Sequence, residues 1–198
     1  MLRPSLVLAA LLVTAGHGHA EELTCQGPLA ADTDHSRLVA AFGPANVMRE
    51  TVYGPEGMEF RGTVVFARDP SRRLTVIWSD EKGRRRPAMV VTTGTGWTGP
   101  KSIRVGTPLA EVEKANGRPF VLYGFQWDYG GTVETWNGGA LAALPGGCTF
   151  DPIFETDPKA PAAAVTSVAS DSQFTSNSPV MRAAMPRIRS IALKYPQR

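Results

Sequence analysis

The fold is decided by residues 107–136, which read TPLAEVEKANGRPFVLYGFQWDYGGTVETW. The first part predicts a short helix over residues 109–115, with Thr107 as its N-cap and Pro108 at its first position. Asn116-Gly117 ends this helix, because Gly readily adopts the left-handed conformation that follows many helices. A helix of two turns is not stable alone, so it must pack on another element.

The second part of the same stretch predicts that other element. Residues 120–129 are rich in aromatic residues, Gly130-Gly131 forms a turn, and residues 132–136 return as the second strand of a hairpin. Turns this short indicate antiparallel strands, because parallel strands need a long crossover connection. The sequence therefore predicts an α+β fold, with short helices packed on antiparallel β-sheet.

A weaker copy of the helix signal occurs earlier in the chain. Asp34 is a candidate N-cap for a helix over residues 36–42, which Gly43-Pro44 ends. Within this copy, Leu38 and Gly43 correspond to Val112 and Gly117 of the later helix. We therefore predict two similar helix-plus-sheet modules, residues 21–100 and residues 101–198.

Further elements follow from alternating or short apolar runs. Strands are predicted at 58–67, 74–78, 148–154 and 187–195, with a turn at 69–72 between the first two. Residues 157–172, rich in Pro, Ala and Ser, predict a surface loop, and Ser178-Pro179 begins another short helix over 180–185.

Composition and the first residues indicate where the protein works. The 198 residues are 42% hydrophobic and 20% charged, which excludes a disordered chain. Residues 1–20 are typical of a secretory signal peptide, with Arg3, an apolar run over 6–13 and Gly18-His19-Ala20 before the cleavage site. The apolar run is too short to span a bilayer. We expect a periplasmic or secreted protein without a transmembrane anchor.

The two cysteines, Cys25 and Cys148, fit that compartment. Because thiols are oxidised outside the cytoplasm, the simpler interpretation is one disulfide between the two cysteines. The alternative is two separately buried thiols. Cys25 follows Thr24 rather than the small residues of a lipoprotein signal, which disfavours a lipid anchor. Two Cys and a distant His lack the spacing of a zinc site, so no metal is expected.

Residues 105–119, Val-Gly-Thr-Pro-Leu-Ala-Glu-Val-Glu-Lys-Ala-Asn-Gly-Arg-Pro, carry one resemblance. They resemble the helix-into-turn segment of small envelope modules, among them the SmpA/OmlA outer-membrane assembly lipoproteins and the β-lactamase inhibitor proteins, which contain two such modules. Residues 116–136 also resemble exported bacterial proteins without an assigned activity. The resemblance implies a sheet-based role in protein binding or in the envelope.

Motifs for common enzyme chemistry are missing or out of context. Residues 94–99 match G-x-G-x-x-G, but Pro100 follows where a dinucleotide site needs a helix N-terminus, so no cofactor is expected. His35 is the one histidine after residue 20, and no G-x-S-x-G elbow accompanies it. We expect His35 to be an ordinary surface residue at a helix start.

Two acidic residues keep an enzymatic alternative open. Asp128 and Glu134 lie on either side of the Gly130-Gly131 turn, where a hairpin can bring two carboxylates together. Glycoside hydrolases place two carboxylates around a sugar bond, and aromatic neighbours suit sugar stacking. The simpler interpretation is that Asp128 starts the turn and Glu134 faces water.

Aromatic residues are the most informative feature. In a strand alternate residues share a face, so Tyr123, Phe125, Trp127 and Tyr129 would project together with Val121, and Trp136 would join them from the next strand. One interpretation is a core face under the helix. The other is a partly wet binding surface, because Tyr and Trp have polar groups on apolar rings.

Basic residues cluster at 72–73 and at 82–86, in or beside predicted turns. A solvated hairpin end is the simpler interpretation, and attraction to an anionic partner is the alternative. The net charge is only +3, which argues against nucleic acid as a partner.

Taken together, the sequence predicts a non-enzymatic exported protein that binds a protein or an envelope component through an aromatic sheet face. The predicted binding residues are Tyr123, Trp127, Asp128, Tyr129 and Trp136. A small glycan-directed hydrolase, or a structural protein without a discrete site, are the alternatives.

Overall fold

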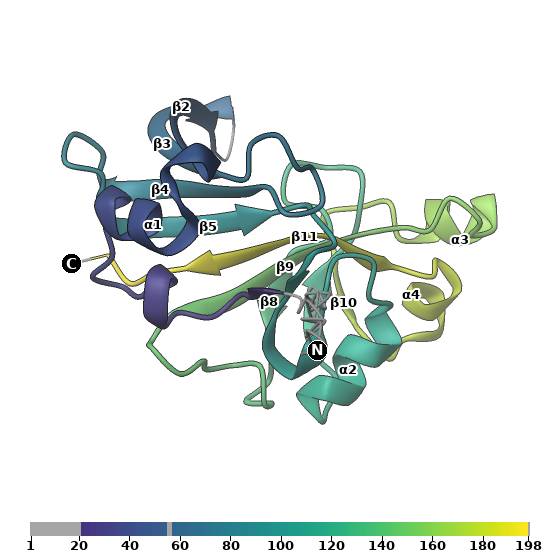
Figure 1. The fold of residues 1–198 in the computed structure, drawn as a ribbon. Helices are drawn as coiled ribbons and strands as arrows, with labels where there is room; N and C mark the ends of the chain where they lie inside the picture. The colour runs from purple at the N-terminus through teal and green to yellow at the C-terminus, as the bar shows by residue number, and fades with distance from the viewer. Residues whose placement is uncertain (1–20, 55–56, 198) are drawn as a thin grey trace, which may run out of the picture.

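The computed structural model describes residues 21–54 and 57–197 (Figure 1). The predicted signal peptide, residues 1–20, lies outside the described residues. The fold is α+β, as predicted, and its main element is a six-stranded sheet with the order β2-β3-β4-β5-β11-β9. Its strands are β2 (Val47–Tyr53), β3 (Glu59–Val65), β4 (Leu74–Asp80), β5 (Arg85–Thr92), β9 (Thr149–Glu155) and β11 (Arg187–Lys194). All neighbouring strands in this sheet are antiparallel.

Two smaller sheets accompany the large one. β7 (Val121–Tyr123) lies between β10 (Gln173–Thr175) and β8 (Val133–Thr135), and both pairings are antiparallel. A bridge between Thr132 and Ile153 connects the start of β8 to β9 of the large sheet. β1 (Glu21–Glu22) pairs in parallel with β6 (Trp97–Thr98) and so fixes the start of the described chain.

The helices are short, and α1, α2 and α4 begin close to where the sequence predicts them. They are α1 (His35–Phe42), α2 (Leu109–Asn116), α3 (Ala162–Ser167) and α4 (Pro179–Ala183), with 3-10 turns η1 (Gly27–Leu29), η2 (Pro44–Asn46) and η4 (Pro100–Ser102). The Asp34 carboxylate accepts a hydrogen bond from the Arg37 amide at 2.8 Å, so the predicted cap of α1 is confirmed. None of the helices within the described ranges has the length and apolar character needed to cross a bilayer.

The cap of α2 differs from the prediction by one residue. Pro108 is the N-cap, and the Thr107 hydroxyl instead accepts a hydrogen bond from the Arg104 amide at 3.0 Å. The predicted end is correct, because Gly117 has φ 79° and its amide donates to the carbonyls of Glu113 and Lys114.

One core connects the two halves of the chain. Leu38 of α1 and Val112 of α2 are both completely buried in the same main hydrophobic cluster. β11, from the second half, pairs with β5, from the first half, so the large sheet crosses the predicted boundary at residue 100. Residues 21–100 and 101–198 therefore do not form separate sheets. α1 lies against β2 and β3, and Figure 1 shows α2 and α4 on the opposite side of the molecule from α1.

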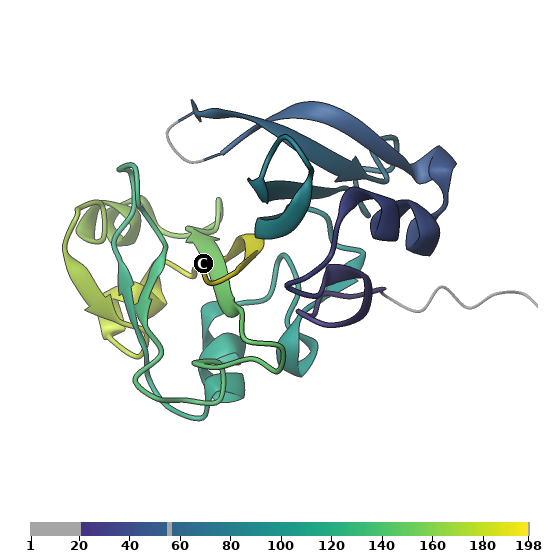
Figure 2. The ribbon, with the colours of Figure 1, turned by 90° about the vertical axis from the view of Figure 1, so that its left-hand side faces the viewer.

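Several elements, among them β2, β5 and α3, were not predicted from the sequence. The strands β2 and β5 carry charged and polar residues among their apolar ones, which conceals the alternation. Helix α3 lies inside the predicted surface loop 157–172, because three consecutive alanines follow Pro161 and favour a helical turn. In Figure 2 the β2–β3 hairpin and the α3–α4 region lie at opposite sides of the molecule.

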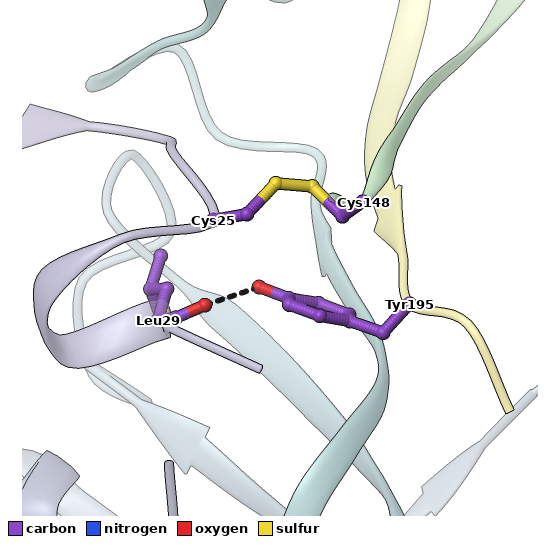
Figure 3. The surroundings of a disulfide bond; sticks show 4 residues. All are labelled: Cys25, Leu29, Cys148 and Tyr195. Atoms are coloured by element: carbon purple, nitrogen blue, oxygen red, sulfur yellow. Dashed lines mark hydrogen bonds between the residues drawn. A yellow bond between two sulfur atoms is a disulfide. The ribbon is translucent and has the colours of Figure 1, made fainter. Parts of the chain in front are cut away.

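The predicted disulfide is confirmed. Cys25 and Cys148 are bonded, with 6.0 Å between their Cα atoms and a sequence separation of 123, and each is only 2% exposed (Figure 3). Beside the bond, the Tyr195 hydroxyl donates a hydrogen bond to the carbonyl of Leu29 (Figure 3). In the chain-entropy model a loop of this length contributes about 4–5 kcal/mol to stability. The N-terminal segment is therefore bound firmly to the start of β9.

Candidate functional site

The predicted strand 120–129 ends much earlier than expected. Strand β7 stops at Tyr123, and residues 124–131 form a loop, which we call the aromatic loop. Gln126 has φ 66°, which lies outside the extended region of a regular strand. The prediction of one continuous aromatic strand face is therefore wrong. Phe125 is only 6% exposed and belongs to the core, although alternation placed it beside Trp127.

Backbone hydrogen bonds hold the aromatic loop at both ends. The amides of Gly124 and Phe125 donate to the carbonyls of Ser172 and Val168 at 2.9 and 2.8 Å. At the other end the Phe154 amide donates to the Gly131 carbonyl at 2.8 Å, and the Gly131 amide donates back to Gly124 at 2.9 Å. The loop is thus closed on itself and fixed to β9.

Two glycines make this close packing possible. A Cβ atom on Gly124 would lie 2.4 Å from the Ser170 carbonyl oxygen. A Cβ atom on Gly131 would lie 2.1 Å from the Phe154 carbonyl oxygen, and Gly131 also has φ 75°. The sequence placed the turn at Gly130-Gly131 correctly, but gave no sign that Gly124 ends the strand.

Three of the predicted binding residues meet around this loop. The Trp127 ring lies 5.4 Å from the Tyr123 ring and 5.4 Å from the Tyr129 ring, with edge-to-face geometry in both pairs. The Trp127 indole NH donates to the Gly124 carbonyl at 3.2 Å, which fixes the orientation of the indole. We call Tyr123, Trp127 and Tyr129 the aromatic cluster. Tyr129 is 50% exposed.

A hollow of about 490 Å³ opens beside the aromatic cluster. Trp127 borders both, so the hollow and the cluster form one site. The remaining lining residues come from the aromatic loop and from the ends of β9 and β11, and they are Phe125, Gln126, Asp128, Gly130, Phe154, Glu155, Thr156 and Arg189. Its volume falls in the range of ligand pockets, which is about 300–1,000 Å³.

Charged groups at this hollow are unpaired. Within the described residues the side chains of Asp128, Glu155 and Arg189 make neither a hydrogen bond nor an ion pair. A second hollow, of about 240 Å³, differs in this respect. There Arg182 is ion-paired with Glu113 at 2.6 Å, and Arg187 is ion-paired with the buried Asp157.

Sequence reasoning found Trp127 and Asp128 but missed Glu155 and Arg189. Arg189 lies at the irregularity between Ile188 and Ser190, where the pairing of β11 with β9 shifts by one residue. Glu155 is the last residue of β9. The hydrogen bond from the Phe154 amide to the Gly131 carbonyl brings the end of β9 and the start of β11 to the aromatic loop. No local pattern in the sequence predicts this contact.

The two predicted carboxylates have different surroundings. Asp128 lines the hollow, whereas Glu134 does not. The Tyr123 hydroxyl hydrogen-bonds to the Glu134 carboxylate, which raises the pKa of Tyr123, and Gln173 donates to the same hydroxyl at 3.4 Å. The carboxylate that shares the hollow with Asp128 is Glu155.

Trp136 is a core residue and not part of this site. It is 9% exposed, and its indole NH donates to the Phe150 carbonyl at 3.2 Å. Its ring lies 4.8 Å from the Phe120 ring and 5.9 Å from the Phe150 ring. We call Phe120, Trp136, Phe150 and Phe154 the core aromatics. The prediction that Trp136 joins the binding face is corrected accordingly.

His35 is more enclosed than the expected surface residue. It is half-buried, and its Nδ1 lies 3.0 Å from the Thr63 hydroxyl, which also accepts from the Trp78 indole at 3.1 Å. Burial lowers the pKa of His35, and the nearby charges of Arg49 and Arg84 lower it further. Across residues 21–54 and 57–197, no three His, Cys, Asp or Glu side chains are grouped to hold a metal ion.

Several basic residues are occupied by internal contacts. Arg72 is ion-paired with Glu21 and lies 3.6 Å above the Phe66 ring. Arg73 pairs with Glu50 at 3.1 Å, and Arg85 pairs with Asp80 at 2.9 Å. The contacts of Arg72 and Arg73 hold the β3–β4 turn and the N-terminal segment in place. The G-x-G-x-x-G stretch is likewise structural: the Gly96 amide donates to Ser71, and Trp97 is 1% exposed.

Comparison with known proteins adds little about activity. No protein-family model matches this chain, and no curated protein matches it. Among solved structures, the uncharacterised protein YfeY from Escherichia coli aligns with 89% of this chain and 99% of its own length, at 12% sequence identity and a TM-score of 0.47.

Proposed function

We propose that this protein is a non-enzymatic binding protein, and that the aromatic cluster and the adjoining hollow form its recognition site. The aromatic loop is fixed by its backbone bonds before any ligand arrives. A site that is already ordered loses little conformational entropy on binding. The unpaired Asp128, Glu155 and Arg189 supply polar groups beside the rings of the aromatic cluster.

The exposure of Trp127 carries this proposal. The other three tryptophans, Trp78, Trp97 and Trp136, are 2%, 1% and 9% exposed. Trp127 is only partly buried, and its indole is nevertheless held by Gly124 and by two tyrosine rings. Tryptophan and tyrosine dominate the binding energy of many interfaces, because large rings bury much apolar area at little entropic cost.

The disulfide between Cys25 and Cys148 supports a place outside the cytoplasm, where disulfides persist. Together with the signal peptide that residues 1–20 predict, it favours a periplasmic or secreted protein. The proposed partner is therefore a protein or another component of the envelope.

Capture from envelope extract tests the proposal. Residues 21–198, with the disulfide formed, are crosslinked to the extract in three forms: wild type, Trp127→Ala and Tyr53→Ala. Tyr53 is the matched control, because it is an aromatic residue 69% exposed on β2, remote in sequence from the aromatic loop. We expect Trp127→Ala to lose the captured component and Tyr53→Ala to retain it. Equal capture by all three forms would refute the proposed site.

A hydrolase acting on a glycan remains the second candidate, because Asp128 and Glu155 line the same hollow. Two carboxylates flanking a sugar bond are what glycoside hydrolysis requires. Release of reducing ends from envelope glycan by the wild type, lost in Asp128→Asn and in Glu155→Gln with folding intact, would favour the enzyme over the binding protein.

A further inference from the structure

We propose that the hollow beside Trp127 binds an uncharged sugar chain, with one sugar ring placed against the indole. This inference rests on the proposed function and names the class of ligand. It follows from the kinds of groups that the structure gathers at the hollow, from their charges, and from the pairing of the neighbouring strand edge.

The apolar part of the site suits a sugar ring. The face of an aromatic ring is electron-rich, and the C–H bonds on one side of a pyranose present weakly positive hydrogens to it. Trp127 lines the hollow and is fixed in orientation by its bond to Gly124. Phe125 and Phe154 also border the hollow, but they are only 6% and 1% exposed, so Trp127 is the ring that a ligand can reach. A flat, fixed surface of this kind selects a flat, rigid ligand.

The polar part of the site suits hydroxyl groups. Asp128 and Glu155 only accept hydrogen bonds when ionised, and Arg189 only donates them. A hydroxyl both donates and accepts, so neighbouring hydroxyls of one sugar ring can satisfy all three side chains. An apolar ligand would offer these three groups no hydrogen-bond partner.

The charges of the site favour an uncharged ligand. Two carboxylates, those of Asp128 and Glu155, and one guanidinium, that of Arg189, line the hollow. A sugar carrying a carboxylate or a phosphate would meet more negative than positive charge. Like charges brought together in a partly enclosed site repel each other strongly, which disfavours acidic glycans.

An extended peptide is a less suitable occupant. Peptides commonly bind by adding a strand to a free sheet edge. Beside the hollow, β8 pairs with β7 on one side, and Thr132 bridges to Ile153 of β9 on the other. The end of the β9 edge that borders the hollow is therefore already bonded at Ile153 and Phe154, which leaves little room for an added strand there.

Tryptophan fluorescence provides the test. Because the other three tryptophans are buried, a ligand at the hollow changes mainly the emission of Trp127. The probes are neutral tetrasaccharides of β-1,4-linked N-acetylglucosamine, β-1,4-linked glucose and α-1,4-linked glucose, with acidic tetragalacturonate for contrast. We expect a saturable blue shift with at least one neutral probe, at a Kd of about 1 mM or tighter, and none with tetragalacturonate. No shift with any neutral probe, or tighter binding of the acidic one, would overturn the inference.

Variants assign the contacts. Asp128→Asn, Glu155→Gln and Arg189→Gln should each weaken the neutral probe about tenfold or more, because hydrogen bonds to charged groups contribute about 1.5–3 kcal/mol. All three side chains lack partners in the free protein, so folding should not change. By calorimetry Trp127→Phe should retain binding and Trp127→Ala should lose it, while Tyr53→Ala binds like the wild type. Unchanged affinity in all three polar variants would place the sugar elsewhere and refute the inference.

This test separates the inference from the proposed function. Trp127-dependent capture of an envelope protein without any sugar binding would support the recognition site and refute the sugar as its ligand. Absence of both capture and sugar binding would refute the proposed function and the inference together.

Discussion

The aromatic cluster and the core aromatics come largely from the same stretch of chain and have opposite surroundings. Phe120 and Trp136 flank the hairpin and pack inside with Phe150 and Phe154, where each is at most 9% exposed. Tyr123, Trp127 and Tyr129 occupy the middle of the same hairpin and lie at the surface. The neighbouring sheet covers Phe120 and Trp136, whereas the aromatic loop carries Trp127 and Tyr129. Whether a tryptophan lies on the loop or at the base of the hairpin, rather than its residue type, decides whether it can contact a partner.

Replacing one tryptophan from each group gives the largest predicted contrast. Trp136→Ala leaves a cavity among Phe120 and Phe150, so it should lower the free energy of unfolding by about 3–5 kcal/mol. Trp127→Ala removes only partly buried contacts and should cost about 1 kcal/mol. Urea denaturation of both variants measures this difference, and equal costs would show that the two groups are not distinct.

Removing the disulfide should lower the free energy of unfolding but leave the aromatic cluster and the hollow largely unchanged. Cys25→Ser with Cys148→Ser frees a long loop, so the free energy of unfolding should fall by about 2–5 kcal/mol. The bond lies at the start of β9, whereas Glu155 at the hollow is the last residue of that strand. The native emission of Trp127 should therefore persist at low denaturant. A changed emission in the folded variant would contradict this separation.

The aromatic loop can be disturbed at its base. In Gly131→Ala the added Cβ would lie 2.1 Å from the Phe154 carbonyl oxygen at φ 75°, so we expect a loss of about 1–3 kcal/mol together with a shifted Trp127 emission. Gly138→Ala is the matched control, since Gly138 has φ 70° but only the end of the Arg118 side chain within 4.0 Å. The control carries the same backbone strain without the clash. If both variants alter Trp127 equally, the close contact is not what positions the loop.

The smallest expected effect is the dependence of the free energy of unfolding on pH, which we attribute to His35. The pKa of His35 is lowered in the folded protein, mainly by burial, so below pH 6.5 the unfolded chain binds more protons than the folded one. The stability due to neutral His35 is therefore complete above pH 6.5 and is lost as pH falls through the folded-state pKa. His35→Gln should flatten the dependence of the urea midpoint on pH over this range. An unchanged slope would exclude His35 as its source.

The fold class was predictable because its signals are local. Asp34, Gly117 and Ser178 mark helix ends through hydrogen bonds to nearby residues, and alternation marked strands β3 and β9. The same sequence concealed β2 and β5, whose exposed positions interrupt the pattern. Compartment chemistry was enough to predict the bond between Cys25 and Cys148.

The site was only half predictable. Trp127 and Asp128 were found because they are unusual residues in one short stretch. Glu155 and Arg189 were missed because their position depends on contacts between segments that are distant in sequence, such as the bond from Phe154 to Gly131. Trp136 was misplaced because alternation was extended through a strand that Gly124 interrupts. Local patterns predict elements, whereas loop closure decides which of their side chains meet.

The position of β11 has a consequence for the order in which the large sheet assembles. This strand, formed by residues 187–194, lies between β5 and β9 and is paired on both sides. Until it has been synthesised, β2–β5 and β9 have no common neighbour, and the large sheet stays in two pieces. Contacts between such distant segments also slow folding. Pairing of β11 with both β5 and β9 is therefore the step that joins the two parts of the large sheet into one.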